Sequence, residues 1–307
     1  MPNLTDGPPG GYLTDRLTDE AVKFIEGNKT RPFLLWFPHY TVHTPLQAKP
    51  ALVKKYEAKA ARLASGEPRF RPEGAGQDRR SQDQAVYAAM VESLDHSIGR
   101  VLDKLKQLNL ERNTIVIFTS DNGGLSTSEG APTSNAPLRA GKGWLYEGGI
   151  REPLLIKWPG VIARGALCDT PVISPDFYPT ILEMAGLPLR PQQRRDGLSL
   201  MPLLKQTGSL PARPQFWHYP HYGNQGGSPG GAIRLGDWKL IEFFEDMRVE
   251  LYNLKNDIGE QSNLAASSPE RVKELRDQLH AIRQETGGLM PVANPEFSGD
   301  VKKSGAK

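Results

Sequence analysis

The chain has 307 residues, a formal net charge of +3 and a charged fraction of 24%. It is long enough to form one large α/β domain with a smaller lobe. No basic stripe is interleaved with aromatic residues, which argues against nucleic acid as a partner. No apolar run of about eighteen residues occurs that could span a membrane. The sole cysteine, Cys168, excludes an internal disulfide.

The start of the chain shows neither the basic nor the apolar segment of a signal peptide. It resembles the middle of a loop, and a helix is expected from about residue 17 to residue 27. These features favour a truncated reading frame or a fragment. The basic run at residues 49–80 also carries acidic residues, glycine and proline, and it is predicted to be a solvated excursion.

Three short apolar runs predict buried strands of a parallel sheet, at residues 33–37, 114–119 and 154–158. Between the first two, apolar residues recur every three or four positions over residues 82–108 and predict a long amphipathic helix. Another helix is expected at residues 177–185. This alternation predicts an α/β fold with a mostly parallel central sheet flanked by helices.

The composition shifts after about residue 204, where proline-rich and glycine-rich stretches predict loops. Strands of a small antiparallel sheet are expected at residues 232–235, 238–243 and 250–253, followed by a helix at 269–286. We therefore expect three parts: part of a catalytic α/β domain over residues 1–206, a small α+β subdomain over 207–290, and a disordered tail over 291–307.

Asp121 and Asn122 directly follow the strand predicted at residues 114–119 and precede two glycines. Ligands of open α/β sheets lie beyond the carboxyl ends of the strands. A carboxylate beside an amide oxygen suits a hard cation such as Ca²⁺ or Mg²⁺. The run S-D-N-G-G is also typical of a plain turn, so both interpretations stay open.

His43 lies six residues beyond the strand predicted at 33–37, at the same rim of the sheet if the strands are parallel. It could transfer a proton near neutral pH, or it could be a loop histidine held by a backbone carbonyl. Lys142 stands between two glycines, where its ammonium could bind an oxyanion or belong to a flexible loop. His39 and His96 are interpreted as structural.

Two further histidines, His218 and His221, lie in the aromatic run at residues 217–222. We predict that this run is a loop at the rim of the site, where it could stack on a sugar and contact its hydroxyls. A surface loop packed on its own lobe is the alternative interpretation.

Taken together, the segments resemble the type I sulfatase family, close to arylsulfatase A and N-acetylgalactosamine-6-sulfatase, within the alkaline phosphatase superfamily. The resemblance extends in order from about residue 11 to residue 264. It rests on the motifs V-H-T-P-L-Q-A, T-I-V-I-F-T-S-D-N-G-G, G-K-G-W-L-Y-E-G-G-I-R-E-P, S-P-D-F-Y-P-T-I-L-E-M-A-G, A-I-R-L-G-D-W-K-L-I and E-L-Y-N-L-K-N-D-I-G-E-Q-S-N-L.

The resemblance implies an alkaline-phosphatase-like fold and hydrolysis of sulfate esters, with a sulfated small molecule or glycan as partner. It implies that Asp121 and Asn122 complete a Ca²⁺ site (Mg²⁺ is possible). By the same resemblance, His43 contacts the sulfate ester and Lys142 binds a sulfate oxygen, so these two are the candidate catalytic residues. Full-length members are expected in the periplasm or outside the cell.

The family's nucleophile is a formylglycine made from Cys or Ser in a C/S-x-P-x-R segment, and no such segment occurs in these residues; Cys168 lacks the following Arg. We therefore assign no nucleophile and expect no activity from these residues alone. Two alternatives stay open: a phosphate or phosphonate ester hydrolase of the same superfamily, and a non-catalytic remnant that binds an anionic glycan.

Overall fold

The computed structural model describes residues 4, 7, 10–63, 68–190, 192–193 and 196–296. Its helices are α1 (Leu13–Asn28), α2 (Pro50–Ala60), α3 (Ala85–Gln107), α4 (Glu147–Ile150), α5 (Phe177–Met184), α6 (Met201–Leu204) and α7 (Pro269–Glu285). Its strands are β1 (Phe70–Glu73), β2 (Gly76–Arg79), β3 (Val116–Thr119), β4 (Leu154–Lys157), β5 (Gln215–Tyr219), β6 (Gly230–Leu235), β7 (Trp238–Phe243) and β8 (Val249–Asn253).

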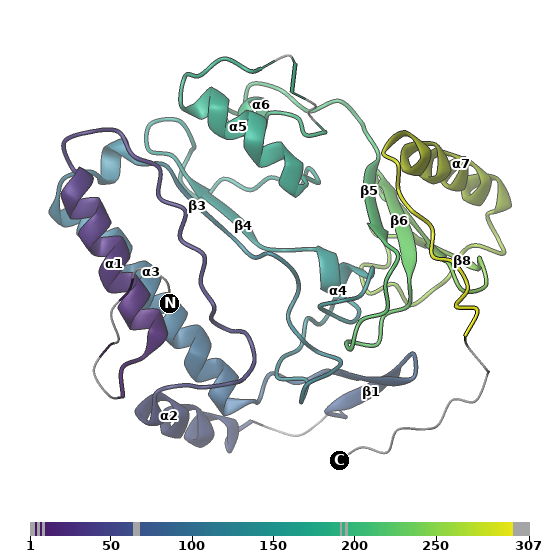
Figure 1. Ribbon diagram of the computed structural model, residues 1–307, viewed down its shortest axis with the longest axis horizontal. Helices are drawn as coiled ribbons and strands as arrows, with labels where there is room; N and C mark the ends of the chain where they lie inside the picture. Colours follow the sequence, from purple (N-terminus) through teal and green to yellow (C-terminus); the bar gives the residue numbers. More distant parts are fainter. Residues whose placement is uncertain are drawn as a thin grey trace.

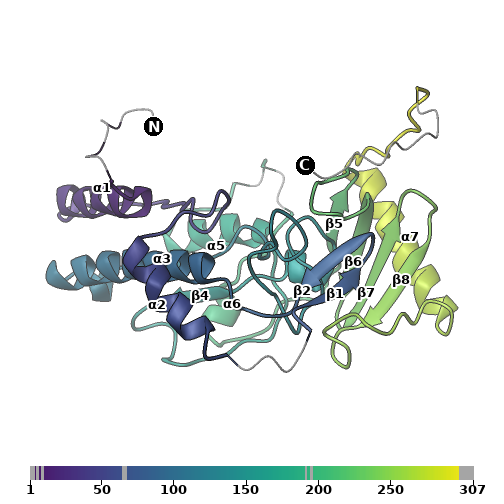
Figure 2. The ribbon, with the colours of Figure 1, turned by 90° about the horizontal axis from the view of Figure 1, so that it is seen from below.

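Helices α1, α2 and α3 lie at one end of the molecule, and strands β5–β8 with helix α7 lie at the other (Figures 1 and 2). Strands β3 and β4 and the short helix α4 lie between these two ends (Figure 1). In chain order the molecule runs from the helical end to the β1–β2 hairpin near the C-terminal sheet, returns to the helical end for α3, and then passes through the centre to the β-rich end (Figures 1 and 2).

Helix α3 confirms the amphipathic helix predicted from the spacing of apolar residues. Its first turn is capped by the Gln84 side chain, which accepts a hydrogen bond from the Val86 backbone N–H at 2.8 Å. Its buried face also carries small polar residues, and Ser97 shares a hydrogen bond of 2.5 Å with Thr18 of α1. The two helices therefore pack with their buried hydroxyls paired.

The predicted direction of the central strands is wrong for the pair that the structure describes. β3 and β4 are antiparallel, with Phe118 opposite Leu155. Residues 33–37 are extended but form no strand there, and Leu34 and Trp36 are 74% and 77% exposed. Apolar runs indicate that a segment suits a sheet, but they carry no information on which neighbour it pairs with or in which direction.

The C-terminal sheet has the strand order β5-β6-β7-β8 and is antiparallel throughout. Strand β7 has the predicted bounds, and β6, β8 and α7 lie within about two residues of theirs. Helix α7 covers one face through Leu275 and Leu279, which are fully buried. The loop prediction for residues 217–222 is wrong for 217–219, because strand β5 includes them and pairs with β6.

The prediction of a solvated excursion at residues 49–80 is wrong for the part that forms the β1–β2 hairpin, whereas helix α2 has no buried residue. This stretch contains α2 and the hairpin of β1 and β2, in which Glu73 and Asp78 are buried. Their charges are paired, Glu73 with Arg139 and Asp78 with Arg71. Composition could not show the burial because the partner of Glu73 lies 66 residues away.

One hydrophobic core joins the C-terminal sheet to the loop before α4. It packs Trp144, Leu145 and Tyr146 against buried residues of the sheet such as Ile241 and Tyr252. The predicted boundary between residues 206 and 207 stays a prediction. Residues 297–307 of the predicted tail lie outside the described residues. Within the described ranges, no helix is both long and apolar enough to cross a membrane.

Candidate functional site

The structure brings His43 and Lys142 together although they are 99 residues apart. Lys142 Nζ lies 2.9 Å from His43 Nε2, and both side chains reach the surface. His43 Nδ1 lies 2.7 Å from the Thr44 carbonyl oxygen, which can only accept a hydrogen bond. Nδ1 therefore carries the proton, and Nε2 presents its lone pair to the Lys142 ammonium.

The Lys142 loop lies close to the backbone that follows β3. The Lys142 N–H donates to the Gly124 carbonyl at 3.2 Å, and a Cβ on Gly141 would lie only 2.1 Å from the same oxygen. Gly143 adopts φ +83°, a backbone conformation that suits glycine. The Asn135 amide joins both segments by donating to the carbonyls of Gly124 and Ala140. These close contacts explain why glycines flank the lysine.

Asp121 and Asn122 lie just beyond the end of β3, as predicted, and outside the packed core. Asn122 Nδ2 donates to Asp121 Oδ2 at 2.6 Å. The next residue, Gly123, donates its N–H to the Gly149 carbonyl of α4 at 3.1 Å. A Cβ on Gly123 would lie 1.7 Å from the Gly148 oxygen, so the turn and α4 touch through their backbones.

These two residues offer oxygen donors of the kind that Ca²⁺ prefers, but too few of them. Ca²⁺ takes roughly six to eight oxygens. Among the described residues, no group of three or more His, Cys, Asp or Glu side chains could hold a metal ion. Burial and the nearby Asp121 carboxylate raise the pKa of Glu152 to about 7. Asp121 and Asn122 do not form a complete Ca²⁺ or Mg²⁺ site by themselves.

A third loop, at residues 223–227, joins the site from the C-terminal lobe. The Gln225 carbonyl accepts hydrogen bonds from Thr127 Oγ1 at 2.7 Å and from the Trp144 indole N–H at 2.8 Å. Trp144 also contacts Gly226 and Gly74 of the β1–β2 turn, where an added Cβ would lie 3.2 Å and 3.0 Å from its ring. The indole therefore fixes three segments around the Lys142 loop.

Glu129 joins the His43 segment to that third loop. Its Oε2 accepts from Thr44 Oγ1 at 2.6 Å, and its Oε1 accepts from Asn224 Nδ2 at 2.8 Å. These two hydrogen bonds, together with the nearby positive charge of Lys142, lower the pKa of Glu129. An ionised carboxylate therefore lies at the same surface as the histidine and the lysine.

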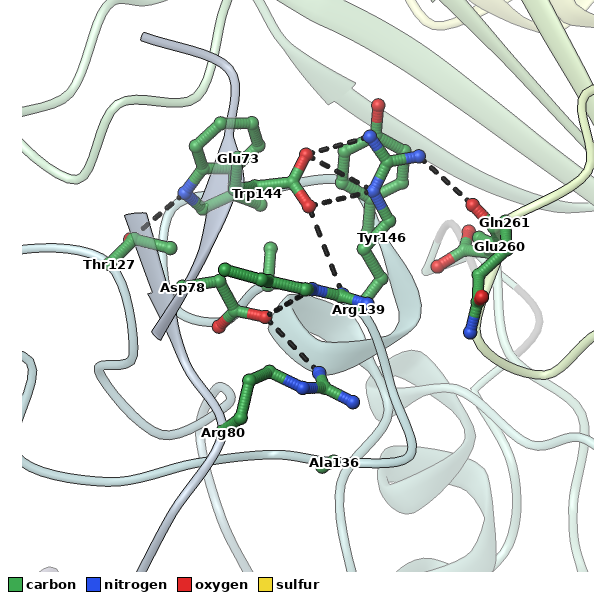
Figure 3. Close-up of polar contacts among 12 residues, drawn as sticks. Glu73, Asp78, Arg80, Thr127, Ala136, Arg139, Trp144, Tyr146, Glu260 and Gln261 are labelled. Atoms are coloured by element: carbon green, nitrogen blue, oxygen red, sulfur yellow. Dashed lines mark hydrogen bonds and ion pairs between the residues drawn. The ribbon is translucent and has the colours of Figure 1, made fainter. Parts of the chain in front are cut away.

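Arg139 ties the β1–β2 hairpin to the C-terminal lobe (Figure 3). Its guanidinium forms two parallel hydrogen bonds with Glu73, at 2.7 and 2.9 Å, and donates to the Glu260 carbonyl at 3.0 Å. It also stacks 3.8 Å from the centre of the Tyr146 ring. Burial opposes the charge of Arg139, but the bonds to Glu73 raise its pKa overall.

A buried lysine of β7 holds α4 in place. Lys239 Nζ lies 2.9 Å from a Glu147 carboxylate oxygen and 2.8 Å from one of Glu260, and all three side chains are at most 2% exposed. Glu260 also accepts the Glu147 backbone N–H at 2.6 Å. Burial raises the pKa of Glu260. For Glu147 burial acts in the same direction, but Lys239 and two arginines outweigh it and lower its pKa.

The structure does not bring His218 and His221 into contact with these residues. His218 Nε2 lies 2.8 Å from the Leu289 carbonyl, and its ring packs against Phe216 and Phe244 within the lobe. His221 packs edge-on against Tyr219. Their predicted substrate contacts stay predictions. His39 packs against the ring of Phe37, and burial lowers its pKa.

Sequence reasoning did not single out the residues that connect the loops, above all Glu129, Asn224, Thr127, Gln225 and Arg139. They are common polar residues in segments that were recognised only as loops. Glu129 and Asn224 lie 95 residues apart, and nothing in a single sequence pairs them. The one available signal was Trp144, a large aromatic residue beside glycine in the G-K-G-W motif.

Comparisons with known proteins agree on one family. The family model described as Sulfatase matches residues 1–187, and the model for the N-sulphoglucosamine sulphohydrolase C-terminal region matches residues 140–285. A sulfatase of Formosa agariphila is 38% identical over 288 residues, covering 87% of this chain and 48% of that protein. Mouse steryl-sulfatase is 35% identical, covering 68% of this chain and 30% of its own.

A solved structure shows the same fold. The crystal structure of Ps i-CgsB in complex with k-i-k-neocarrahexaose superimposes with a TM-score of 0.74 at 29% identity, covering 91% of this chain and 56% of that one. The fold is therefore alkaline-phosphatase-like, with a C-terminal antiparallel sheet and helix, as predicted. The chain spans about half or less of the length of these curated relatives.

Proposed function

Because the chain belongs to the sulfatase family, we propose that it serves the hydrolysis of sulfate esters, with a sulfated carbohydrate as the substrate. The observation that carries this proposal is the contact between Lys142 Nζ and His43 Nε2. It places a fixed positive charge and a proton-transfer group at one exposed point. A sulfate ester needs both, one for its oxygens and one for its leaving alcohol.

Lys142 would bind a sulfate oxygen. Its ammonium has three donors and needs only one for His43, so the others can reach an anion. As the bond to sulfur breaks, negative charge develops on the leaving oxygen, and a nearby ammonium stabilises it.

His43 would supply the proton to that oxygen. Its Nδ1 proton is fixed on the Thr44 carbonyl, so Nε2 is the atom that exchanges protons with a ligand. Protonated at Nε2, the ring could donate to the departing alcohol, and it would return to the neutral form seen here. The contact with Lys142 keeps Nε2 aimed at the position where the ester would lie.

The comparison structure supports a carbohydrate as the alcohol part, because Ps i-CgsB was crystallised with an oligosaccharide. Asp121 and Asn122 are proposed as two of the ligands of a divalent cation. The formylglycine of the family has no counterpart segment among the printed residues. Anion binding is therefore a sharper test of His43 and Lys142 than turnover is.

The test is titration of the 307-residue chain with inorganic sulfate and 4-nitrophenyl sulfate, followed by ligand-observed NMR. We expect both anions to bind, and Lys142→Ala to weaken both by about tenfold or more, the loss for a charge-assisted contact. Lys255→Ala, an exposed lysine of the C-terminal lobe, is the matched control. Equal binding by the Lys142 variant and its control would contradict the proposal.

A further inference from the structure

We propose that Glu129 and Asn224 form a subsite that binds a hydroxyl group of the alcohol near the esterified position, so that the site selects sulfated polyols. The inference rests on the proposed sulfate site at His43 and Lys142 and names the part of the substrate that lies beside it. The pair joins two loops that are 95 residues apart in sequence.

The position of the pair follows from the contacts of Glu129. One carboxylate oxygen accepts from Thr44, the residue directly after His43, and the other accepts from Asn224. The charge of the Lys142 ammonium acts on the same carboxylate. Glu129 and Asn224 therefore lie at the margin of the histidine–lysine contact, and both are exposed to an incoming ligand.

The charges divide this surface into two sides. A sulfate group is attracted to the Lys142 ammonium and repelled by the Glu129 carboxylate, so it takes the lysine side. The carboxylate must then face a part of the substrate that is uncharged and donates hydrogen bonds. A hydroxyl fits, because it can donate to Glu129 and accept from the Asn224 amide or the lysine.

A sugar sulfate carries such a hydroxyl on a carbon near the ester, whereas a simple phenyl sulfate does not. Binding a ligand without that hydroxyl would leave the carboxylate partly desolvated and without a new donor. A ligand that lacks the hydroxyl gives up a hydrogen bond to a charged acceptor, so the site favours the ligand that carries it.

The loops that carry the pair are held in place before any ligand arrives. The Gln225 carbonyl, next to Asn224, accepts from both Thr127 and the Trp144 indole. Thr127 lies two residues before Glu129, so the same contact fixes both halves of the pair. A subsite fixed in this way loses little entropy on binding, and the hydroxyl contact can contribute its full free energy.

The experiment compares three probes on the full chain: galactose 6-sulfate, 4-nitrophenyl sulfate and inorganic sulfate. Affinities are measured by ligand-observed NMR for the wild type, Glu129→Gln and Asn224→Ala. Glu57→Gln, an exposed glutamate of α2, is the matched control. Both members of the pair are exposed, so the variants are expected to fold, and thermal denaturation checks this.

We expect the wild type to bind galactose 6-sulfate more tightly than 4-nitrophenyl sulfate. Relative to the other two probes, each variant should lose about tenfold in affinity for the sugar ester, the loss of a charge-assisted hydrogen bond. Equal changes for all three probes would show a purely electrostatic or structural role. That outcome overturns the subsite and leaves the proposed function standing.

Two other outcomes bear on the proposed function as well as on the subsite. If neither the esters nor inorganic sulfate bind the wild type, or if Lys142→Ala binds all three unchanged, the anion site itself is wrong. The proposed function and the subsite then fall together. Tight sugar binding that survives both pair variants overturns the subsite alone.

Discussion

The two ends of the molecule differ in how completely they bury their apolar surface. In the C-terminal lobe, Ile233, Leu240 and Ile241 are fully buried between α7 and the loop before α4. Outside this lobe, Leu34, Trp36 and Leu155 are 74%, 77% and 60% exposed. Core residues cover both faces of the sheet of the lobe, whereas these three apolar side chains face solvent.

This difference shows where the site gets its rigidity. Lys142 stands in a loop whose following residues, Trp144 to Tyr146, belong to the core of the C-terminal lobe. His43 stands in a stretch without helix or strand, between α1 and α2. One half of the candidate site is thus built on the packed lobe, and the other half is held to it by side-chain contacts such as Glu129 with Thr44.

The largest effect is expected from Lys239→Met, which removes the positive charge between Glu147 and Glu260. Two buried carboxylates would then lack their shared partner, which costs about 3–5 kcal/mol of unfolding free energy for a buried pair. The loss should appear as a lower midpoint of urea denaturation followed by tryptophan fluorescence. Lys142-dependent sulfate binding should weaken as well, because Glu147 begins α4 beside that loop.

The matched control is Lys273→Met, which breaks an exposed ion pair with Asp277 on α7. Exposed pairs contribute little, so the urea midpoint should stay where it is. If Lys239→Met also left the midpoint unchanged, the lobe would not depend on this network. The contrast between the two ends would then have to rest on apolar packing alone.

A smaller, pH-dependent effect is expected at Glu242 of β7. Burial opposes its ionisation, but Arg283, His280 and Arg276 outweigh it and hold the pKa of Glu242 below its ordinary value of 4.5. The stability it contributes is therefore fully present above pH 4.5 and is lost as the pH falls through its lowered value. Glu242→Gln should cost about 1–3 kcal/mol at neutral pH, the contribution of hydrogen bonds to a charged group.

The measurement is urea denaturation of the wild type and Glu242→Gln at a series of pH values from neutral to acid. The difference in unfolding free energy between the wild type and Glu242→Gln should narrow as the pH falls. The wild type then loses the stabilisation by the ionised carboxylate, which the variant already lacks. Glu270→Gln, on the exposed start of α7, should follow the wild type at every pH. A gap that stayed constant would show that the carboxylate contributes through its shape and not through its charge.

The sequence predicted the elements whose pattern is local. Helix α3 and strand β7 agree with prediction because a 3.6-residue period identifies the helix, and a short run rich in aromatic and branched residues identifies the strand, without knowledge of their neighbours. Strand β5 was not predicted because prolines flank it and its residues resemble a loop. The direction of β3 against β4 depends on pairing, which the apolar pattern does not encode.

The same distinction holds for the candidate site. His43, Lys142, Asp121 and Asn122 were singled out because each stands in a recognisable motif, and the structure brings the first two into contact. Glu129 and Asn224 stand in no such motif. Glu129 and Asn224 come together only because Thr127 donates a hydrogen bond to the Gln225 carbonyl. Folding creates this contact between residues that are 98 positions apart in the sequence.

The smallest effect is expected from Trp36→Ser in the exposed stretch at residues 33–37. A side chain that is 77% exposed has little burial to lose, so the unfolding free energy should change by less than about 0.5 kcal/mol. What should change is association: light scattering at high protein concentration should fall, because an exposed tryptophan beside Leu34 offers apolar surface to a second molecule.

Leu279→Ala is the control from the packed end, where emptying a fully buried position costs about 2–5 kcal/mol. A Trp36→Ser loss as large as that of Leu279→Ala would show that the stretch is packed in solution, and the contrast between the two ends would disappear.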